Sequence, residues 1–587
     1  MGCRAVFDAY YVCMEDRRTL AFIPLAALIA ISPFIFHGPS CGHDFEFHLR
    51  NWLEVGSQWR QGILLPRWDF TAAWNSGEPR FVFYPPISWI VGALLGLILP
   101  WVAVPNVFIW MALTGCGFTM YRLAREWTSP GNALIASCFY MVHPYMLFTF
   151  YERAAYAELL AAAWIPLVLL SVLRPRITLP GIAIPICLLW LTNAPAAVMG
   201  SYALALFGLV RVGLNCRGLK GFKAALREGA AVAAGAAVGI GCAAFYVVPA
   251  TMEQRWVRIS MPFLRGVRYQ DNLLFGHIGD PAHDAILRSA SLCGVSLVAF
   301  ALVAMTVAYG REQATQLAGH EGNARRRAIV SLGLVTCCIA FLLTSPSAVL
   351  WRHLPKLLFL QFPWRFCAVL GTTSAALLAL ALGRTKLHPV AAVAISFSLT
   401  LALTLGGNAC FRQVCFSSFD VAGIVDSFWS GGRYDYTDEY PPVGADGEKL
   451  QHSNPSFWLA KSPANSAPVG AGSDYSVALS RRLEFTVTTP VPAFVVLSLR
   501  DYPAWRITIN GRFAGARPHR DDGLIVLPVA GGISHIGITY VNAHDSLAGW
   551  IVTSVSAIVL LFIWRRQRER AGVGAGDKGD RKVEPGV

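Results

Sequence analysis

Four side chains suited to acid–base chemistry follow the first long apolar run of the sequence. The run from Leu20 to Gly42 contains no Asp, Glu, Lys or Arg and is long enough to cross a bilayer. The stretch CGHDFEFHLRNW, at 41–52, then presents His43, Asp44, Glu46 and His48. A carboxylate there can act as a general base, and an imidazole can hydrogen-bond beside it. The stretch is therefore a candidate site, and the alternative is a helix N-cap at Asp44 with solvated neighbours.

A second group of ionisable residues lies in the short segment FYERAAYAELL, which is flanked by apolar runs. It contains Glu152, Arg153, Tyr156 and Glu158. Ionisable side chains at a helix end often extend to water, which is the ordinary interpretation. Three of them so close together, with a tyrosine between them, favour a binding or catalytic site next to the membrane.

Arginines in predicted outer loops form a third group, because outer loops are usually poor in basic residues. The candidate ligand-binding residues are Arg265, Arg268 and Arg365. Arginine stays charged and binds phosphate through two hydrogen bonds, which predicts an anionic ligand; the alternative is that loops of this length tolerate arginine. Trp68 belongs either to a sugar- or lipid-binding surface or to the aromatic belt at the membrane interface.

The composition indicates what kind of protein positions these groups. Of 587 residues, 55% are hydrophobic and 14% are charged, against about 25% charged in soluble domains. Charge-free apolar runs predict an all-α polytopic membrane protein with about twelve spanning helices. The runs are 20–38, 105–121, 131–150, 158–173, 177–192, 195–210, 229–250, 289–310, 328–347, 366–383, 389–410 and 547–564. The net charge of +14 does not indicate nucleic-acid binding, because the basic residues cluster in short turns between these runs.

The distribution of basic residues also orients the helices. If the apolar segment 81–99 does not cross, nearly all basic clusters lie on one side, which the positive-inside rule makes cytoplasmic. The Pro85-Pro86 pair favours a re-entrant or interfacial element there. Both termini are then cytoplasmic. Four longer segments face outward: 39–104, 251–288, 348–365 and 411–546.

The last outer segment changes character near Ser480. Short runs rich in β-branched and aromatic residues, separated by turn-forming pairs, predict a small antiparallel β-sandwich. The runs are 483–489, 493–499, 504–510, 523–529 and 535–541. Residues 415–480 are rich in Gly, Pro, Ser and Asp and are predicted to be loop, and Cys410 could pair with Cys415. The expected organisation is a membrane domain at 1–410, an extracytoplasmic domain at 411–546, a final helix at 547–564 and a disordered cytoplasmic tail at 565–587.

The order of these motifs resembles the GT-C superfamily of polytopic glycosyltransferases, and more closely the bacterial membrane-protein family called "6-pyruvoyl-tetrahydropterin synthase-related". The matching pieces are GHDFEFHLRNW (42–52), LPRWD (65–69), WNSGEPRFVFYPP (74–86), PYMLFTFYERAAYAELLAAAWIPL (144–167) and LQFPWRF (360–366). The stretch YPAWRITINGR (502–512) resembles the outer β-region of related membrane proteins. The pterin label does not indicate an activity, because the three-histidine zinc site of pterin synthases is absent.

The resemblance implies roles for individual residues. Asp44 matches the acid that acts as base or holds a metal in GT-C enzymes, with Glu46 beside it, and Glu158 occupies the second acidic position. The family's adjacent acidic pair is missing at 152–158. A divalent cation such as Mg²⁺ or Mn²⁺ would bind Asp44 and Glu158. A basic residue near the lipid phosphate is also expected, and the candidates are Arg153, Arg365 and one of Arg255, Arg258, Arg265 or Arg268.

These observations favour a glycosyltransferase of the bacterial cytoplasmic membrane that acts on its outer face. The donor would be a polyprenyl-phosphate sugar held among membrane lipids, and the acceptor an unidentified glycan, lipid or protein. Two alternatives remain open. One is a transporter or flippase of a lipid-linked or anionic solute, since broken segments such as 81–99 also occur in transporters. The other is a non-catalytic scaffold that keeps a transferase fold.

Overall fold

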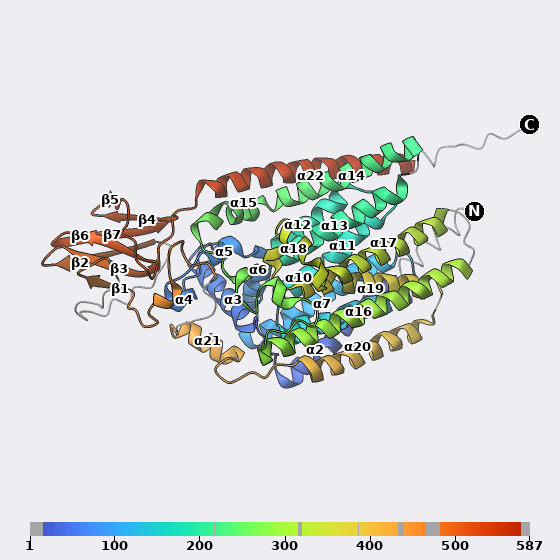
Figure 1. The fold of residues 1–587 in the computed structure, drawn as a ribbon, viewed down its shortest axis with the longest axis horizontal. Helices are drawn as coiled ribbons and strands as arrows, with labels where there is room; N and C mark the ends of the chain where they lie inside the picture. Colours follow the sequence, from blue (N-terminus) through green and yellow to red (C-terminus); the bar gives the residue numbers. More distant parts are fainter. Residues whose placement is uncertain are drawn as a thin grey trace, which may run out of the picture.

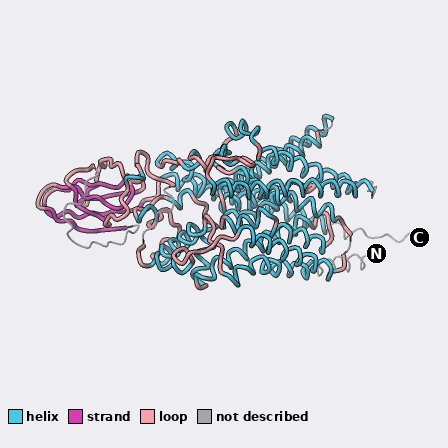
Figure 2. The backbone as a smooth tube through the Cα atoms, turned by 60° about the horizontal axis from the view of Figure 1, so that its bottom comes forward, coloured by secondary structure: helices cyan, strands magenta, loops and turns pink. Residues whose placement is uncertain are grey.

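A long helical bundle is joined at one end to a small β-domain (Figure 1). The computed structural model describes residues 16–216, 218–314, 320–385, 387–432, 439–464 and 482–576. Figure 2 shows the same arrangement from another side, with helices filling the bundle and the strands gathered beyond one end. The predicted fold class, a polytopic helical membrane protein with a C-terminal β-domain, is confirmed.

Nine stretches of the described chain are long and apolar enough to span a membrane. They contain α2 (Phe22–His37), α7 (Val104–Ala124), α10 (Tyr156–Ala162) with α11 (Ile165–Leu173), α13 (Ala194–Asn215), α14 (Gly218–Cys242), α16 (Pro281–Ala314), α19 (Cys367–Leu382), α20 (Pro389–Phe411) and α22 (His544–Gly576). Two bent pairs raise the number to 11. One joins α8 (Pro130–Val142) to α9 (Pro144–Leu147) and the π-helical turn η2 (Phe148–Glu152), and the other joins α17 (His320–Leu342) to α18 (Ala348–His353).

Three predicted spans differ in detail from the structure. The span at 177–192 is α12 (Leu179–Thr192), which at 14 residues is short for a crossing. The span at 229–250 is broken at Ala243, where α14 ends and α15 (Ala244–Met252) begins. The final helix α22 continues to Gly576 and includes the first part of the predicted tail, while residues 577–587 lie outside the described chain.

The turns predicted to be cytoplasmic meet at one end of the bundle. Arg125 pairs with Asp16 at 2.7 Å, and Arg174 pairs with Glu126 at 2.7 Å. Arg325 donates to the carbonyl of Trp127 at 2.8 Å, which brings the turn after α16 to the same place. The common location confirms the grouping of these turns, while their cytoplasmic side remains a prediction.

The segment 81–99 forms two short helices, α5 (Arg80–Phe83) and α6 (Pro86–Ile98). At 13 residues, α6 extends about 20 Å, less than the hydrocarbon core. It packs against α3 (Phe45–Arg60), where a Cβ at Gly92 would lie 2.2 Å from the Trp52 ring. Glycine is therefore required where α6 crosses α3. The short length of α6 agrees with the prediction that the segment 81–99 does not span the membrane.

The β-domain contains two antiparallel sheets packed face to face. One has the order β1-β3-β6, from β1 (Phe457–Ala460), β3 (Ala493–Arg500) and β6 (Leu524–Val529). The other has the order β2-β7-β4-β5, from β2 (Arg482–Thr489), β7 (Gly532–Tyr540), β4 (Trp505–Ile509) and β5 (Arg512–Phe513). The predicted strands are present. The prediction that 415–480 is loop is wrong in part, because this segment contains α21 (Val421–Trp429) and β1.

Trp68 of the first outer segment completes the hydrophobic core of the β-domain. Its ring is 2% exposed and packs on Trp505 at 5.2 Å and Tyr502 at 5.6 Å between ring centroids. Because the ring is enclosed, Trp68 presents no surface to a sugar or lipid. The interpretation of Trp68 as a binding platform is therefore wrong, and the residue instead attaches the β-domain to the bundle.

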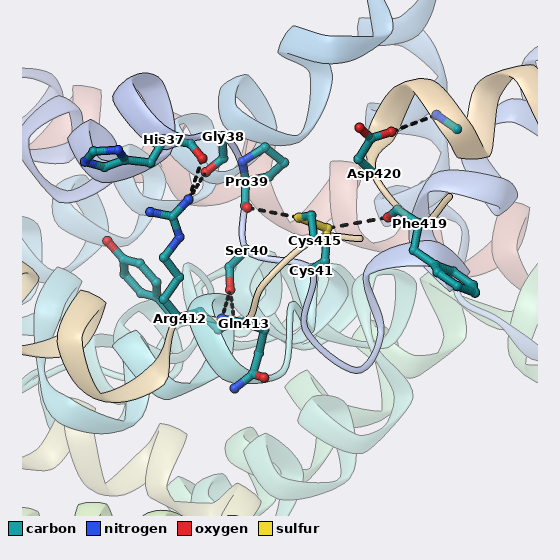
Figure 3. The surroundings of a disulfide bond; sticks show 12 residues. His37, Gly38, Pro39, Ser40, Cys41, Arg412, Gln413, Cys415, Phe419 and Asp420 are labelled. Atoms are coloured by element: carbon teal, nitrogen blue, oxygen red, sulfur yellow. Dashed lines mark hydrogen bonds between the residues drawn. A yellow bond between two sulfur atoms is a disulfide. The ribbon is translucent and has the colours of Figure 1, made fainter. Parts of the chain in front are cut away.

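A disulfide joins Cys41, just before the candidate stretch, to Cys415 at the start of the last outer segment (Figure 3). The predicted Cys410–Cys415 pair is corrected, since Cys410 is a free, exposed thiol at the end of α20. The Ser40 hydroxyl also accepts a hydrogen bond from the backbone amide of Gln413 at 2.8 Å. Two predicted outer segments from opposite ends of the chain are thus tied together beside the candidate residues.

Candidate functional site

A cavity of about 500 Å³ lies at the end of the bundle that carries the β-domain. Its walls come from the start of α3, the α12–α13 turn, α15, the segment 356–365 and the segment 439–440. It is lined by three acids and three cations among many apolar groups. The charged lining residues are Asp44, Glu158, Glu439, Arg153, Arg365 and Lys356.

Asp44 enters this cavity from the residue that precedes α3. Its backbone amide donates to the carbonyl of Arg153 at 2.8 Å. Although Asp44 occupies the N-cap position, its side chain makes no capping hydrogen bond. Within the described chain its carboxylate has neither a hydrogen bond nor an ion pair. The capping alternative therefore fails, and the carboxylate is available to a ligand.

Gly42 explains how the 41–44 segment reaches this position. A Cβ there would lie 2.3 Å from the backbone oxygen of Glu152, so only glycine allows the two segments to cross. Directly beyond the crossing, Ala154 has a φ of 50°. This left-handed conformation is strained for alanine and is typical of functional sites. The close crossing places Asp44 beside Arg153.

Glu158 is held between two arginines opposite Asp44. Its carboxylate accepts from Arg153 Nη1 at 2.8 Å and from the Tyr145 hydroxyl at 2.6 Å, and it lies 3.5 Å from Arg365 Nε. Arg365 Nε is buried without a hydrogen bond. Two guanidinium groups contact one carboxylate here, and the Arg365 Nε donor left without a hydrogen bond suits an anionic ligand.

His48 lines the cavity, and Tyr156 packs behind its ring. The two rings stack at 5.4 Å between centroids, and Tyr156 stacks on Trp52 behind them at 5.6 Å. Burial lowers the pKa of His48 to about 4. The imidazole is consequently neutral near pH 7, so it can form hydrogen bonds in the cavity without adding positive charge.

Several predicted site residues lie elsewhere. Glu46 pairs with Arg50 at 2.8 Å away from the cavity lining. His43 and Glu152 lie 3.7 Å apart near the disulfide, where Glu152 also accepts from Gln413. Arg265 and Arg268 belong to a separate shallow depression on the 265–279 loop. The structure thus brings together Asp44, His48, Arg153, Glu158 and Arg365, with Tyr156 behind them.

Sequence reasoning missed Glu439 and did not connect Tyr84 with Tyr440. Both tyrosines line the cavity. Each begins a Tyr-Pro-Pro sequence, one at 84–86 and the other at 440–442, and Glu439 directly precedes the second. This repeated tripeptide is the signal that could have paired two segments so distant in the chain.

The predicted metal ligands do not fit a metal ion. Both oxygens of Glu158 already accept hydrogen bonds, one from Tyr145 and one from Arg153. No group of three His, Cys, Asp or Glu side chains able to hold a metal occurs in the described ranges. Arg153 and Arg365 occupy the positions next to Glu158 where a metal ion would lie.

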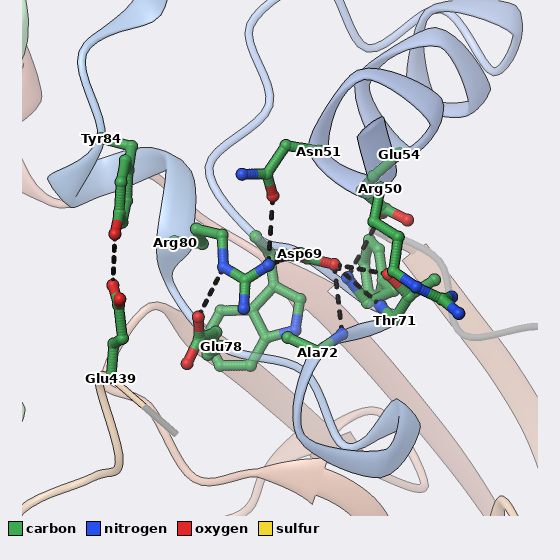
Figure 4. A network of polar contacts seen from close by, with 12 residues as sticks. Arg50, Asn51, Glu54, Asp69, Thr71, Ala72, Glu78, Arg80, Tyr84 and Glu439 are labelled. Atoms are coloured by element: carbon green, nitrogen blue, oxygen red, sulfur yellow. Dashed lines mark hydrogen bonds and ion pairs between the residues drawn. The ribbon is translucent and has the colours of Figure 1, made fainter. Parts of the chain in front are cut away.

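A second network of buried charges lies on another face of α3 (Figure 4). Arg80 contacts Asp69 at 2.8 Å and Glu78 at 2.7 Å, and it donates to Asn51 at 3.1 Å. Burial raises the pKa of Glu78 to about 7. Burial and the charge of Asp69 also raise the pKa of Glu54, to about 8. None of these side chains lines the cavity.

Comparisons with known proteins leave the family open. No protein-family model and no curated protein sequence matches the chain. The cryo-EM structure of the arabinofuranosyltransferase AftD from mycobacteria is similar at 18% identity and a TM-score of 0.38, and a mutant of it at 15% and 0.37. The alignments cover 71% of this chain but only 27% and 28% of AftD. At this level of similarity the activity of AftD does not transfer, and the closer resemblance to the pterin synthase-related family stays a prediction.

Proposed function

We propose that the chain is a membrane glycosyltransferase that moves a sugar from a polyprenyl-phosphate donor to an acceptor hydroxyl. The Asp44 carboxylate carries the proposal. It has no partner among the described residues, and it lies within electrostatic reach of Arg153 and Arg365 in one cavity. An available base in the same cavity as two arginines is the arrangement that transfer from a phosphate ester requires.

The charges assign the reacting groups. Asp44 accepts the proton of the acceptor hydroxyl. The oxygen of that hydroxyl bonds to the anomeric carbon of the donor sugar at the same time. The bond from that carbon to the phosphate oxygen breaks, and the lipid phosphate leaves with the electron pair. Arg153 and Arg365 stabilise the charge that develops on the phosphate. Displacement from the face opposite the phosphate inverts the anomeric configuration.

The apolar walls support a lipid-linked donor. Val198, Val247, Phe359 and Leu360 line the cavity together with the charged groups. A sugar nucleotide has no hydrocarbon chain to pack against such walls, whereas a prenyl chain gains about 0.8 kcal/mol for each buried methylene. The cavity therefore offers one region for hydrocarbon and one for phosphate.

One observation favours transport as a second candidate function. The pair formed by α8 with α9 and η2 bends by 43° and ends in a π-helical turn directly before Arg153. Broken helices beside a binding site are typical of transporters, and π-helical turns often lie at functional sites. A transporter would move the lipid-linked solute without releasing lipid phosphate.

Release of lipid phosphate distinguishes these functions. Full-length protein in nanodiscs would receive polyprenyl-phosphate sugars, and binding and free lipid phosphate would be followed for wild type, Asp44→Asn and Glu46→Gln. We expect Asp44→Asn to keep binding and to lose about 10²- to 10⁴-fold in release rate. Glu46→Gln, two residues away and outside the cavity, should behave as wild type, and EDTA should leave the rate unchanged. Release at the wild-type rate by Asp44→Asn would contradict the assignment, and binding without release would favour transport or a scaffold.

A further inference from the structure

The cavity has a second polar region, which is built by the two Tyr-Pro-Pro sequences. The Tyr84 hydroxyl donates to Glu439 Oε2 at 2.5 Å. The rings of Tyr84 and Tyr440 meet edge to face at 6.1 Å between centroids. Tyr440 also stacks on Phe83 at 4.5 Å. One carboxylate of the cavity therefore lies among aromatic rings, and it makes no ion pair with Arg153 or Arg365.

The backbone fixes Glu439 in this place. The carbonyl of Pro441 accepts from the Arg258 amide at 2.8 Å, and the Val443 amide donates to the carbonyl of Trp256 at 3.1 Å. These bonds hold 439–443 as an extended segment along 256–258. The carboxylate is thus carried by a fixed segment, which is a requirement for orienting a ligand.

Glu439 also has unused hydrogen-bonding capacity. In the described part of the chain, Tyr84 is its one hydrogen-bond partner, and it forms no ion pair. A carboxylate has two oxygens and can accept several hydrogen bonds, so it can accept further hydroxyl donors. Burial raises the pKa of Glu439, and the Tyr84 hydrogen bond with the charges of Arg80 and Arg365 offsets only part of this effect.

This combination fits one class of ligand. A carboxylate accepts hydroxyl hydrogen bonds, and aromatic faces pack against the C–H surface of a ring, so together they suit a polyhydroxylated ring. An anion would be repelled by Glu439, and a purely apolar group would leave the carboxylate buried without a partner. Asp44 and Glu439 line the same cavity, so a ring bound at Glu439 shares that cavity with the base.

We propose that Glu439, Tyr84 and Tyr440 form the acceptor-binding region of the cavity and that the acceptor is a carbohydrate. Glu439 accepts a hydrogen bond from an acceptor hydroxyl that does not react and so orients the reacting hydroxyl toward Asp44. This inference rests on the proposed transferase function, and it adds the chemical class of the acceptor and a binding residue.

The test separates dependence on the acceptor from dependence on the donor. Full-length wild type, Glu439→Gln and Tyr84→Phe in nanodiscs would receive a polyprenyl-phosphate sugar with increasing concentrations of methyl glycosides or of hexanol. We expect at least one glycoside, and not hexanol, to accelerate release of lipid phosphate from wild type. Glu439→Gln should raise the half-saturating glycoside concentration about 10- to 100-fold, the range for a hydrogen bond to a charged group. The donor KM should change much less than the half-saturating glycoside concentration.

The pH profile separates a binding role from a structural one. In wild type the half-saturating glycoside concentration should fall as pH rises through the raised pKa of Glu439, because the carboxylate accepts hydroxyl hydrogen bonds better than the neutral acid. Glu439→Gln should abolish this dependence while keeping the wild-type melting temperature. Tyr84→Phe should move its midpoint, because it removes the hydroxyl that donates to the carboxylate.

Three results would overturn the inference. The first is a changed donor KM in Glu439→Gln with unchanged dependence on the glycoside. The second is a pH dependence that survives the substitution. The third is equal stimulation by hexanol, or none by any glycoside, in protein that still releases lipid phosphate into water. Failure of wild type to release lipid phosphate at all would instead contradict the proposed function.

Discussion

Two buried charge clusters lie beside α3, one around Glu158 in the cavity and one around Arg80 beneath the β-domain. In the first, two arginines surround one glutamate, and the Arg365 side chain is 12% exposed. In the second, Asp69 and Glu78 surround one arginine, and the Arg80 side chain is 0% exposed. The clusters use the same residue types, but arginines outnumber the carboxylates in direct contact in the first and carboxylates outnumber the arginine in the second, and the two differ in solvent access.

The sign of the excess explains the difference. Excess negative charge in a closed cluster is removed when a carboxyl group takes up a proton, and the raised pKa values of Glu54 and Glu78 fit this. Arginine cannot be neutralised in this way, because it stays protonated in proteins. The arginine charge that Glu158 does not match is therefore compensated by a second anion, which is Asp44 in the same cavity or a bound ligand. Burial alone does not distinguish a binding site from a structural cluster, whereas unmatched arginine beside a cavity does.

We call the Arg80 cluster closed, because its arginine is fully buried, and the Glu158 cluster open. Removal of Arg80 from the closed cluster should have the largest effect on stability. Arg80→Met leaves Asp69 and Glu78 buried without their cation, which costs about 3–5 kcal/mol of unfolding free energy. Thermal unfolding of the full-length protein in detergent checks this. Arg482→Met is the matched control, since its pair with Glu484 is exposed and contributes about 0–1 kcal/mol. Equal melting temperatures for both variants would contradict the structural role.

The corresponding change in the cavity should affect binding instead of stability. Arg365→Gln removes a positive charge from the open cluster and should weaken binding of undecaprenyl phosphate about 10- to 100-fold. Titration in nanodiscs measures the affinity, and the melting temperature should fall much less than in Arg80→Met. Unchanged affinity together with a large loss of stability would make the two clusters alike.

The pH should affect the closed cluster next most strongly. A carboxyl group whose pKa is raised on folding stabilises the protein at low pH, and this contribution is lost as pH rises through the folded pKa. Stability should therefore fall between about pH 4.5 and 8, by up to about 1.4 kcal/mol per pH unit for each titrating group. Melting temperatures across this range should fall less steeply in Glu54→Gln. An identical slope in that variant would show that Glu54 does not titrate there.

The smallest effect is expected outside both clusters. Arg268 is half exposed and pairs with Asp271 at 2.9 Å on the surface loop. Arg268→Gln should change the affinity for undecaprenyl phosphate and the unfolding free energy by less than about 1 kcal/mol. A loss of affinity as large as that of Arg365→Gln would mean that the anion binds at the loop and that the cavity has been assigned wrongly.

Much of the bundle could be predicted, because long apolar runs and basic turns are local properties of the sequence. Asp44, Arg153 and Glu158 could be found for the same reason, since each lies in a short motif beside an apolar run. The β-strands were visible from their alternation and turn pairs, whereas β1 is only 4 residues long and lies in a polar segment.

The distant pairings could not be predicted. Glu439 reaches the cavity through backbone bonds between 256–258 and 441–443, which no local pattern reveals. Trp68 is of a residue type that is common at membrane interfaces, and only its packing against Tyr502 and Trp505 shows that it is enclosed. Cys41 and Cys415 are separated by 374 residues, so their pairing depends on the complete fold.

The separation of these two cysteines also has a consequence for biosynthesis. Cys415 follows α20, so the bond can close only after nearly all the helices have been synthesised and inserted. At about 5–20 residues per second, the segment that carries Asp44 waits on the order of half a minute for its partner. During this interval the nascent chain has an unfinished site, and a truncated chain that ends before Cys415 can never close it. The covalent bond thus ties assembly of the site to completion of translation.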